Sequence, residues 1–367
     1  MSAAAAAASS SKGGQQTQAQ VPFLLGSSEY TETPFGSFTS ILGAAAVPVT
    51  PVWQVTPGNF LSGITLTITS TGGVLPTSGA LTADGALAVI NYLSFVNTGG
   101  GEILYPMPLF EYVMAQKWLR PWAGDPQQNA AYSNSINPAL VVDLSIGVKD
   151  TLAILSNTDA RAQYRLRCTL AQSSAIATGA STQPTVTVTA AIKAWAQPPA
   201  TDYAGRSIYP YPPGLGVSRK LMSQTLNMAA SGTSTLQLTL TGDEIRGLIL
   251  ICRTSAGVRT DLTDANAGPI MFRLDNGIQW TMLPSQIIHR METFYCQYFG
   301  ASIHRETGVY ALPRFRSPNG GDPWLPTVEQ SYLSLQLGSA DIASGTIEIL
   351  YDQLAVGIVL PPSLESI

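Results

Sequence analysis

The stretch "GEILYPMPLFEYVMAQKW" (Gly101–Trp118) has a counterpart in the second half of the chain, "GIQWTMLPSQIIHRMETF" (Gly277–Phe294). Each opens with glycine, places a proline seven positions later, at Pro108 or Pro284, and then passes from a short apolar run into helical spacing. Two identities in eighteen positions are close to chance, so the shared feature is the pattern rather than the residues. The pattern predicts the same strand-to-helix step in two parts of the chain.

The totals agree with two domains. A chain of 367 residues exceeds the size of about 250 to 300 residues at which single cores stop growing. Apolar residues make up 45%, enough for two cores, whereas charged residues make up only 11%, against a usual share of about 25%. The surface must therefore consist largely of neutral polar residues, which favours close packing against other protein molecules.

Charge and cysteine usage exclude several classes. The net charge is -4 and the basic residues are scattered, so no basic stripe is expected, and we predict no direct sequence-specific binding of nucleic acid. Cys168, Cys252 and Cys296 are too far apart for a disulfide framework or a metal knuckle, which favours synthesis in a reducing compartment. The sequence shows neither a secretion signal nor a run of 18 apolar residues.

Alternation with a period of two dominates the chain. In "GITLTITS", Ile64, Leu66 and Ile68 face one side, and the threonines between them face the other. The same alternation recurs in "TLQLTLT", "YLSLQL" and "TIEILY". Further strands are expected around Trp53 and at residues 86–96, 139–148, 163–170, 185–195, 246–254 and 268–275. Many short antiparallel strands divided by turns, with 33 Gly and 25 Pro, predict an all-β protein made of sandwiches or jelly rolls.

Two helices are expected, one after each proline of the opening pair. After Pro284, Ile287 and Met291 begin an apolar stripe, with His289 and its neighbours on the polar side. After Pro108 the apolar stripe is broader. We expect each helix to cross one end or side of its own sandwich.

Composition divides the chain into four parts. Residues 1–36 are rich in Ala, Ser, Gln and Gly and predict a flexible N-terminal arm. Residues 198–214 hold five prolines and predict a semi-rigid connector, because proline cannot donate to a strand ladder. The first β-domain then covers residues 37–197, and the second, with a C-terminal tail, covers 215–367.

No residue set points to catalysis. The only histidines are His289 and His304, and no nearby cysteine or suitably spaced glutamate completes a zinc site. No G-x-S-x-G elbow accompanies them, and no carboxylate pair stands out. We therefore predict no catalytic residue, no metal, no cofactor and no enzymatic activity.

Trp118 and Trp122 flank Arg120 and Pro121 just after the first expected helix. Such an aromatic cluster can close the end of a core, anchor a neighbouring subunit or stack on a sugar. We favour core or intersubunit contact.

Three further segments resemble one known family. "VTPGNFLSGITLTITST" (Val55–Thr71) resembles the opening strands of the first jelly roll in the double jelly-roll major capsid proteins of tailless, membrane-containing icosahedral dsDNA viruses, the tectivirus-like bacteriophage coat protein above all. "RETGVYALPRF" (Arg305–Phe315) and "GTIEILYDQL" (345–354) resemble the late second jelly roll. The architecture that holds these segments spans residues from about 37 to 360.

The resemblance implies two tandem eight-stranded jelly rolls, each with a short helix after an internal strand. It also implies a homotrimer with a nearly hexagonal outline that tiles the shell of a virion after synthesis in the host cytoplasm. Its partners would be other copies, minor capsid and vertex proteins, and an internal membrane reached through the arm. Residues expected to act in structure or subunit contact are Trp118, Trp122, Pro108, Pro284, Ile287 and Met291.

Two other functions stay open from the residues alone. A tandem β-sandwich that binds a carbohydrate or a receptor would carry aromatic loops on one rim, and Trp118 or Trp122 would be needed for binding. A jelly-roll glycoside hydrolase or lyase would need one essential carboxylate. The sparse charge and the two histidines make the enzyme the weakest of the three hypotheses.

Overall fold

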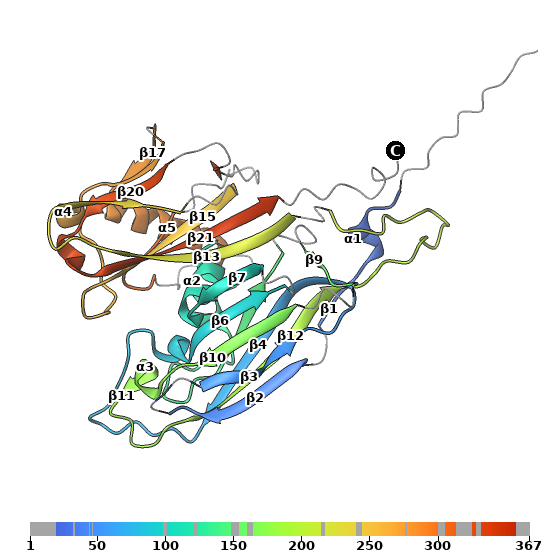
Figure 1. Cartoon of the computed structure of the whole chain (residues 1–367), viewed down its shortest axis with the longest axis horizontal. Coiled ribbons are helices and arrows are strands. Elements are labelled where there is room, and N and C mark those ends of the chain that lie inside the picture. The colour runs from blue at the N-terminus through green and yellow to red at the C-terminus, as the bar shows by residue number, and fades with distance from the viewer. Residues whose placement is uncertain are drawn as a thin grey trace, which may run out of the picture.

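The computed structural model describes most of the chain as two β-structured units joined side by side (Figure 1). The described residues are 20–31, 34–43, 45, 47–97, 101–119, 124–147, 154–159, 164–213, 217–239, 244–275, 277–299, 305–312, 325–327 and 332–356.

The first unit is a jelly roll of two facing antiparallel sheets. One sheet has the order β2 (Gly36–Ile41), β12 (Thr185–Trp195), β4 (Phe60–Thr71) and β8 (Leu140–Ser145). The other has the order β3 (Val47–Gln54), β10 (Arg165–Leu170), β6 (Ile90–Val96) and β7 (Glu102–Met107).

The second unit repeats this arrangement. One sheet has the order β13 (Val217–Asn227), β21 (Thr346–Val356), β15 (Glu244–Arg253) and β18 (Val309–Leu312). The other has the order β14 (Thr233–Gln237), β20 (Leu333–Gly338), β16 (Ile270–Leu274) and β17 (Gly277–Met282). If these eight strands are counted along the chain in each unit, both units have the orders first–eighth–third–sixth and second–seventh–fourth–fifth. The predicted double jelly roll is confirmed.

The repeated stretches are the same element of each roll. In the first roll, the fifth strand, β7, is followed by helix α2 (Leu109–Leu119), and in the second roll the fifth strand, β17, is followed by α5 (Pro284–Phe299). The prediction of a helix after each proline is confirmed. Pro284 is the first residue of α5, where its missing N–H costs no helical hydrogen bond, whereas Pro108 lies just before α2.

Shorter helices and strands lie outside the sixteen main strands and the two long helices. They are α1 (Phe23–Gly26), β1 (Glu29–Thr31), β5 (Ala80–Leu81), η1 (Gly85–Ala88), η3 (Pro126–Gln128), β9 (Leu155–Ser156), α3 (Ser173–Ile176), β11 (Ala177–Thr178), α4 (Asp264–Ala267), β19 (Leu325–Pro326) and η4 (Ala340–Ile342). The strand expected from residue 86 begins only at Ile90, because the residues before it form η1, which Gly85 opens with a positive φ of 50°.

Threonine alternation produces the sheet of the first roll that contains β2, β12, β4 and β8. In β12 every second residue is buried, and β4 pairs with it from Thr185–Thr71 to Trp195–Phe60. The buried side carries residues such as Ile64 and Val188. On the other side, hydroxyl pairs such as Thr39 and Thr187 (Oγ–Oγ 2.9 Å) link neighbouring strands. The sheet therefore has an apolar inner face and a hydroxyl-rich outer face.

The two rolls share a sheet and a core. Strand β7 of the first roll pairs in parallel with β13 of the second at Leu104 and Leu221, so that strands of both rolls form one nine-stranded sheet. Buried apolar residues of both rolls belong to a single continuous cluster. The contact between the rolls is thus part of the folded core.

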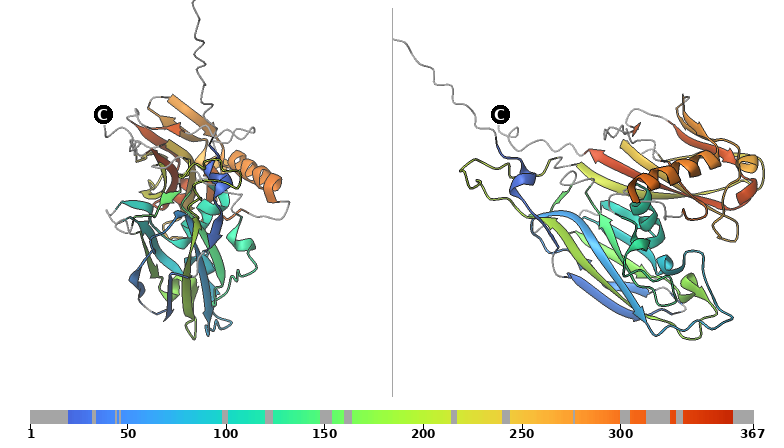
Figure 2. Two further views of the ribbon diagram at one scale, coloured as in Figure 1. Left: turned by 90° about the vertical axis from the view of Figure 1, so that its right-hand side faces the viewer. Right: turned by 180° about the vertical axis from the view of Figure 1, so that it is seen from behind.

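Two predictions need correction. Part of the expected arm belongs to the first roll: β1 pairs with β12, and Phe23 of α1 is 2% exposed and packs edge-on against Phe60. Residues 1–19 of the predicted arm lie outside the described residues. The second correction concerns α2, which does not simply cross its own roll but lies between the two rolls (Figures 1 and 2).

Candidate functional site

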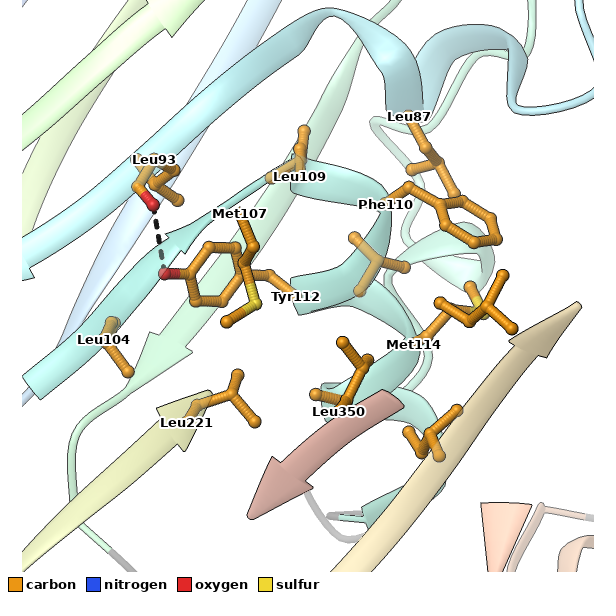
Figure 3. Close-up of a cluster of buried hydrophobic side chains, with 14 of the residues drawn as sticks. Leu87, Leu93, Leu104, Met107, Leu109, Phe110, Tyr112, Met114, Leu221 and Leu350 are labelled. Atoms are coloured by element: carbon orange, nitrogen blue, oxygen red, sulfur yellow. Dashed lines mark hydrogen bonds between the residues drawn. The ribbon is translucent and has the colours of Figure 1, made fainter. Parts of the chain in front are cut away.

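Helix α2 forms the joint between the rolls, and one of its faces packs on its own roll. Tyr112 donates its hydroxyl to the carbonyl oxygens of Leu93 (3.1 Å) and Tyr105 (2.6 Å), both in the first roll. Leu109 and Val113 on the same side have no exposed surface. Figure 3 shows this face against β6 and β7.

The opposite face of α2 packs on the second roll. The Phe110 ring lies under two guanidinium groups of that roll, with ring-to-carbon distances of 5.7 Å to Arg253 and 4.7 Å to Arg259. Leu221 of β13 and Leu350 of β21 point toward α2 from the second roll (Figure 3). Both faces of the helix are therefore covered by protein, and ten of its eleven residues are buried.

Lys117 of α2 anchors the first of three ion-pair clusters. Its Nζ lies 2.5 Å from Glu306 Oε1 of the second roll and 3.1 Å from Asp125 Oδ2 of the first. The side chains of Lys117 and Asp125 are each 1% exposed. The neighbouring Trp118 donates from Nε1 to Glu306 Oε2 at 3.3 Å. A buried lysine between two carboxylates is an ionic contact that joins the rolls.

The second cluster centres on Asp84 of the first roll. Its Oδ2 lies 3.0 Å from Arg253 Nη2, and its Oδ1 lies 2.7 Å from Arg259 Nε. Arg253 also binds Glu348 Oε1 through Nε at 3.0 Å. A single carboxylate of one roll thus holds two arginines of the other.

The third cluster lies beside the paired strands β7 and β13. Arg219 binds Asp352 Oδ1 through Nε at 2.5 Å and donates from Nη1 to the carbonyl oxygen of Ser145 in the first roll at 2.7 Å. Arg246 Nη1 reaches the other oxygen of Asp352 at 3.2 Å. The side chains of Arg219 and Asp352 are 4% and 1% exposed.

Glu111 of α2 is a buried carboxyl beside these clusters. Burial, reinforced by the nearby Glu348 carboxylate, raises the pKa of Glu111 to about 8. Its Oε2 has no hydrogen-bond partner. Near neutral pH the folded protein therefore keeps this group protonated.

The joint concentrates the sparse charge of the chain. The residues of these clusters are Asp84, Glu111, Lys117, Asp125, Arg219, Arg246, Arg253, Arg259, Glu306, Glu348 and Asp352. They amount to about a quarter of the 19 basic and 23 acidic residues. This role was not predicted from the sequence, although charged residues inside apolar runs, such as Lys117 in "VMAQKWL" and Asp352 in "EILYDQL", were a signal of it.

Helix α5 of the second roll has one covered face and one open face. Ile287 and Met291 are 2% and 1% exposed and face the core of the second roll. Ser285, His289 and Thr293 on the other side are exposed. Figure 2 shows α5 on the outside of the second roll.

The structure places the remaining predicted site residues as follows. Trp118 is 3% exposed at the joint, Pro284 is buried at the start of α5, and Pro108 is half-buried before α2. Trp122 lies outside the described residues. The structure does not bring Trp118 near Pro284, Ile287 or Met291 as one site, because α2 and α5 occupy equivalent places in different rolls.

The described residues offer little for catalysis. Among them no three His, Cys, Asp or Glu side chains gather as a metal site, and His289 stands exposed on α5. His304 lies outside them. Cys168 is free and buried, and burial raises its pKa to about 12, so it is not a reactive thiolate. A cleft beside Tyr112 and Arg219 has a volume of about 10 Å³, room for about one water molecule and far too small for a substrate.

No helix in the described part of the chain is long and apolar enough to span a bilayer.

Solved structures of viral coat proteins have the same fold. The STIV MCP aligns over 93% of this chain and 100% of its own, with a TM-score of 0.61 and 12% identity. A chain from the atomic structure of Sulfolobus Turreted Icosahedral Virus aligns over 90% and 91%, with a TM-score of 0.60 and 11% identity. PBCV-1 VP54, in a structure fitted into a reconstruction of the virophage Sputnik, aligns over 89% and 93%, with a TM-score of 0.55 and 13% identity.

No family model matches the sequence, and no curated protein matches it. At identities this low the structural likeness establishes the fold, a double jelly roll of the kind found in viral major capsid proteins.

Proposed function

We propose that this protein is a major capsid protein, which self-assembles as a homotrimer with a pseudo-hexagonal outline and tiles the icosahedral shell of a virus. The observation that carries the proposal is the repetition of one strand order in two rolls that are locked into a single body by α2. Three such bodies place six equivalent rolls around one axis, a shape that fills a hexagonal lattice from a single gene product.

The chemistry of the chain supports a structural role. Charge is scarce overall, and about a quarter of it lies at the joint between the rolls, while hydroxyl-rich strand faces remain that can pack closely against other copies. Coverage of nearly the whole chain by capsid-protein structures supports the same proposal. No catalytic role is included in it.

The proposed location is the virion, after synthesis in the host cytoplasm. The proposed partners are other copies of this chain, minor capsid and vertex proteins, and an internal membrane met by the N-terminal arm. The alternative of a sugar-binding module loses one of its two key residues, because the Trp118 indole is buried against Glu306 and cannot stack on a ligand.

Native mass spectrometry with negative-stain microscopy of the full chain tests the proposal. We expect a trimer with a hexagonal outline. A compact monomer at every concentration would overturn the capsid function and return attention to a binding module.

A further inference from the structure

The two helices of the repeat can be compared residue by residue. If their first helical residues are superposed, Leu109 on Pro284, the core-facing Tyr112 coincides with Ile287. This register differs by one residue from the alignment of the two prolines in the sequence. The burial patterns agree with it, because Ile287 and Met291 then lie on the face that α2 turns toward its own roll.

The face of α2 that covers the second roll has its counterpart in the open face of α5. On α2 this face carries Phe110, Glu111, Met114, Lys117 and Trp118. The equivalent residues of α5 are Ser285, Gln286, His289, Glu292 and Thr293, and all five are exposed. The same element is therefore docked in the first roll and open in the second.

The strand before each helix repeats the difference. The outer edge of β7 pairs with β13 of the second roll at Leu104 and Leu221. Strand β17 pairs with β16, and no strand of the described chain occupies its other edge. Ile278 on β17 is 57% exposed. An open strand edge next to an open helix face is a ready template for another chain.

The surface that receives α2 also has a counterpart. Helix α2 docks against β21 and β15, and Leu221 of β13 points toward it (Figure 3); these are the eighth, third and first strands of the second roll. The same three strands of the first roll are β2, β12 and β4. Their outer face carries mainly small hydroxyl residues, with Ile41 at the end of β2 and Lys193 near the end of β12 beside them: Ser37, Thr39, Thr65, Thr67, Thr187 and Thr189.

The open face of α5 and the outer face of β2, β12 and β4 match in chemistry. The open face of α5 is polar and nearly neutral, with one acidic residue among hydroxyl, amide and imidazole groups. The outer face of β2, β12 and β4 offers hydroxyl donors and acceptors on short side chains, which lose little conformational entropy when they are ordered. Apart from the exposed Ile41, both surfaces are polar and can face water in a free chain, unlike the apolar Leu221 and Leu350 under α2.

We propose that α5 and the edge of β17 dock on the outer face of β2, β12 and β4 in a second copy of this chain. The contact repeats between copies the one that α2 and β7 make inside each copy. It rests on the proposed self-assembly and specifies a heterologous interface, which uses two different surfaces and can close into a ring.

Mixing two blocked variants tests this contact in the full chain. His289→Trp places bulk on the α5 face, and Thr187→Trp places it on the sheet face. Thr235→Trp, at an exposed position on β14 that the proposal leaves free, is the matched control. Glu292→Trp and Thr67→Trp are second variants for the two faces, and circular dichroism verifies that each variant is folded.

Native mass spectrometry should show the wild type and Thr235→Trp assembled alike. His289→Trp alone and Thr187→Trp alone should need at least a tenfold higher concentration to assemble. An equimolar mixture of the two should form heterodimers, because the intact α5 of one variant meets the intact sheet of the other, but it should form no closed ring.

Other results overturn the contact. If both blocked variants assemble like Thr235→Trp, the interface lies elsewhere while self-assembly stands. If only one of the two variants is impaired, the contact uses the same surface on both copies and is not heterologous. A wild type that stays monomeric at every concentration would instead overturn the proposed function itself.

Discussion

Helices α2 and α5 occupy the same place in two rolls of identical strand order, yet their sequences differ as their surroundings do. Helix α2 is covered on both sides and buries even Glu111 and Lys117, whereas α5 keeps an apolar face for its own roll and a polar face outside. The difference shows that a helix without a polar face, such as α2, is covered by protein on a second side. The charges inside α2 show where that surface is, because each is neutralised or paired against the second roll.

The largest expected effect is a difference in the free energy of unfolding between substitutions at one equivalent position of α2 and α5. Lys117→Met leaves the buried carboxylates of Asp125 and Glu306 without their shared cation, and we expect a loss of about 3 to 5 kcal/mol in the free energy of unfolding. Glu292→Met at the equivalent place on α5 should change it by less than about 0.5 kcal/mol. Denaturant unfolding of the two variants measures both values, and equal losses would contradict the comparison.

The next effect tests the covered face of α5. Ile287→Ala or Met291→Ala should lower the free energy of unfolding by about 2 to 5 kcal/mol, because each leaves a cavity in the core of the second roll. His289→Ala on the open face serves as control and should stay within about 0.5 kcal/mol of the wild type. A large loss for His289→Ala in the isolated chain would mean that this face is covered after all.

A smaller effect depends on pH. The pKa of Glu111 is about 8 in the folded protein, far above its ordinary value, so the unfolded chain loses this proton at lower pH than the folded chain. Stability from this group is complete below about pH 4.5 and is lost as the pH rises to about 8. The change should be on the order of a few kcal/mol across that range.

Two substitutions, one at Glu111 and one at the equivalent position of α5, serve as controls for the pH effect. Glu111→Gln should flatten the decline in stability between pH 5 and 8, and urea unfolding at a series of pH values would measure it. Gln286 holds the equivalent, exposed position on α5, so Gln286→Glu should introduce no comparable decline. A decline that persists in Glu111→Gln would assign it to another group.

The smallest effects concern the two prolines. Pro108→Gly and Pro284→Gly should each cost about 1 kcal/mol or less, mainly through the greater freedom of the unfolded chain. Thermal melts should therefore rank both below Ile287→Ala. The reverse ranking would contradict the position of the helix starts.

Most elements of the fold could be predicted from the sequence, because each leaves a local pattern. The alternation of threonine with apolar residues predicted β4 and β12, and the prolines Pro108 and Pro284 indicated where α2 and α5 begin. The joint could not be predicted, since local periodicity does not tell which strand pairs with which, as β7 does with β13. The docking of Phe23 was missed for a related reason: a single aromatic in a polar segment has no periodicity, and its contact with Phe60 is visible only in three dimensions.

Some residues of the joint and of α5 were noticeable in the sequence, and others were not. Ile287 and Met291 stand out as structural residues by their apolar spacing, and Trp118 by its place in an aromatic cluster with Trp122; the burial of the three described side chains Trp118, Ile287 and Met291 is consistent with that role. Lys117 and Glu306 escaped notice because their pairing joins positions that are distant in the sequence.

The contact of α2 with the second roll joins two parts of one chain across the connector between β12 and β13. Its formation therefore depends on an effective concentration set by that connector and not on how much protein is present. Every chain can complete this contact as it folds, before it meets another copy. Dilution can separate copies from one another, but it does not affect the pairing of the two rolls. Only the contacts between copies therefore depend on protein concentration.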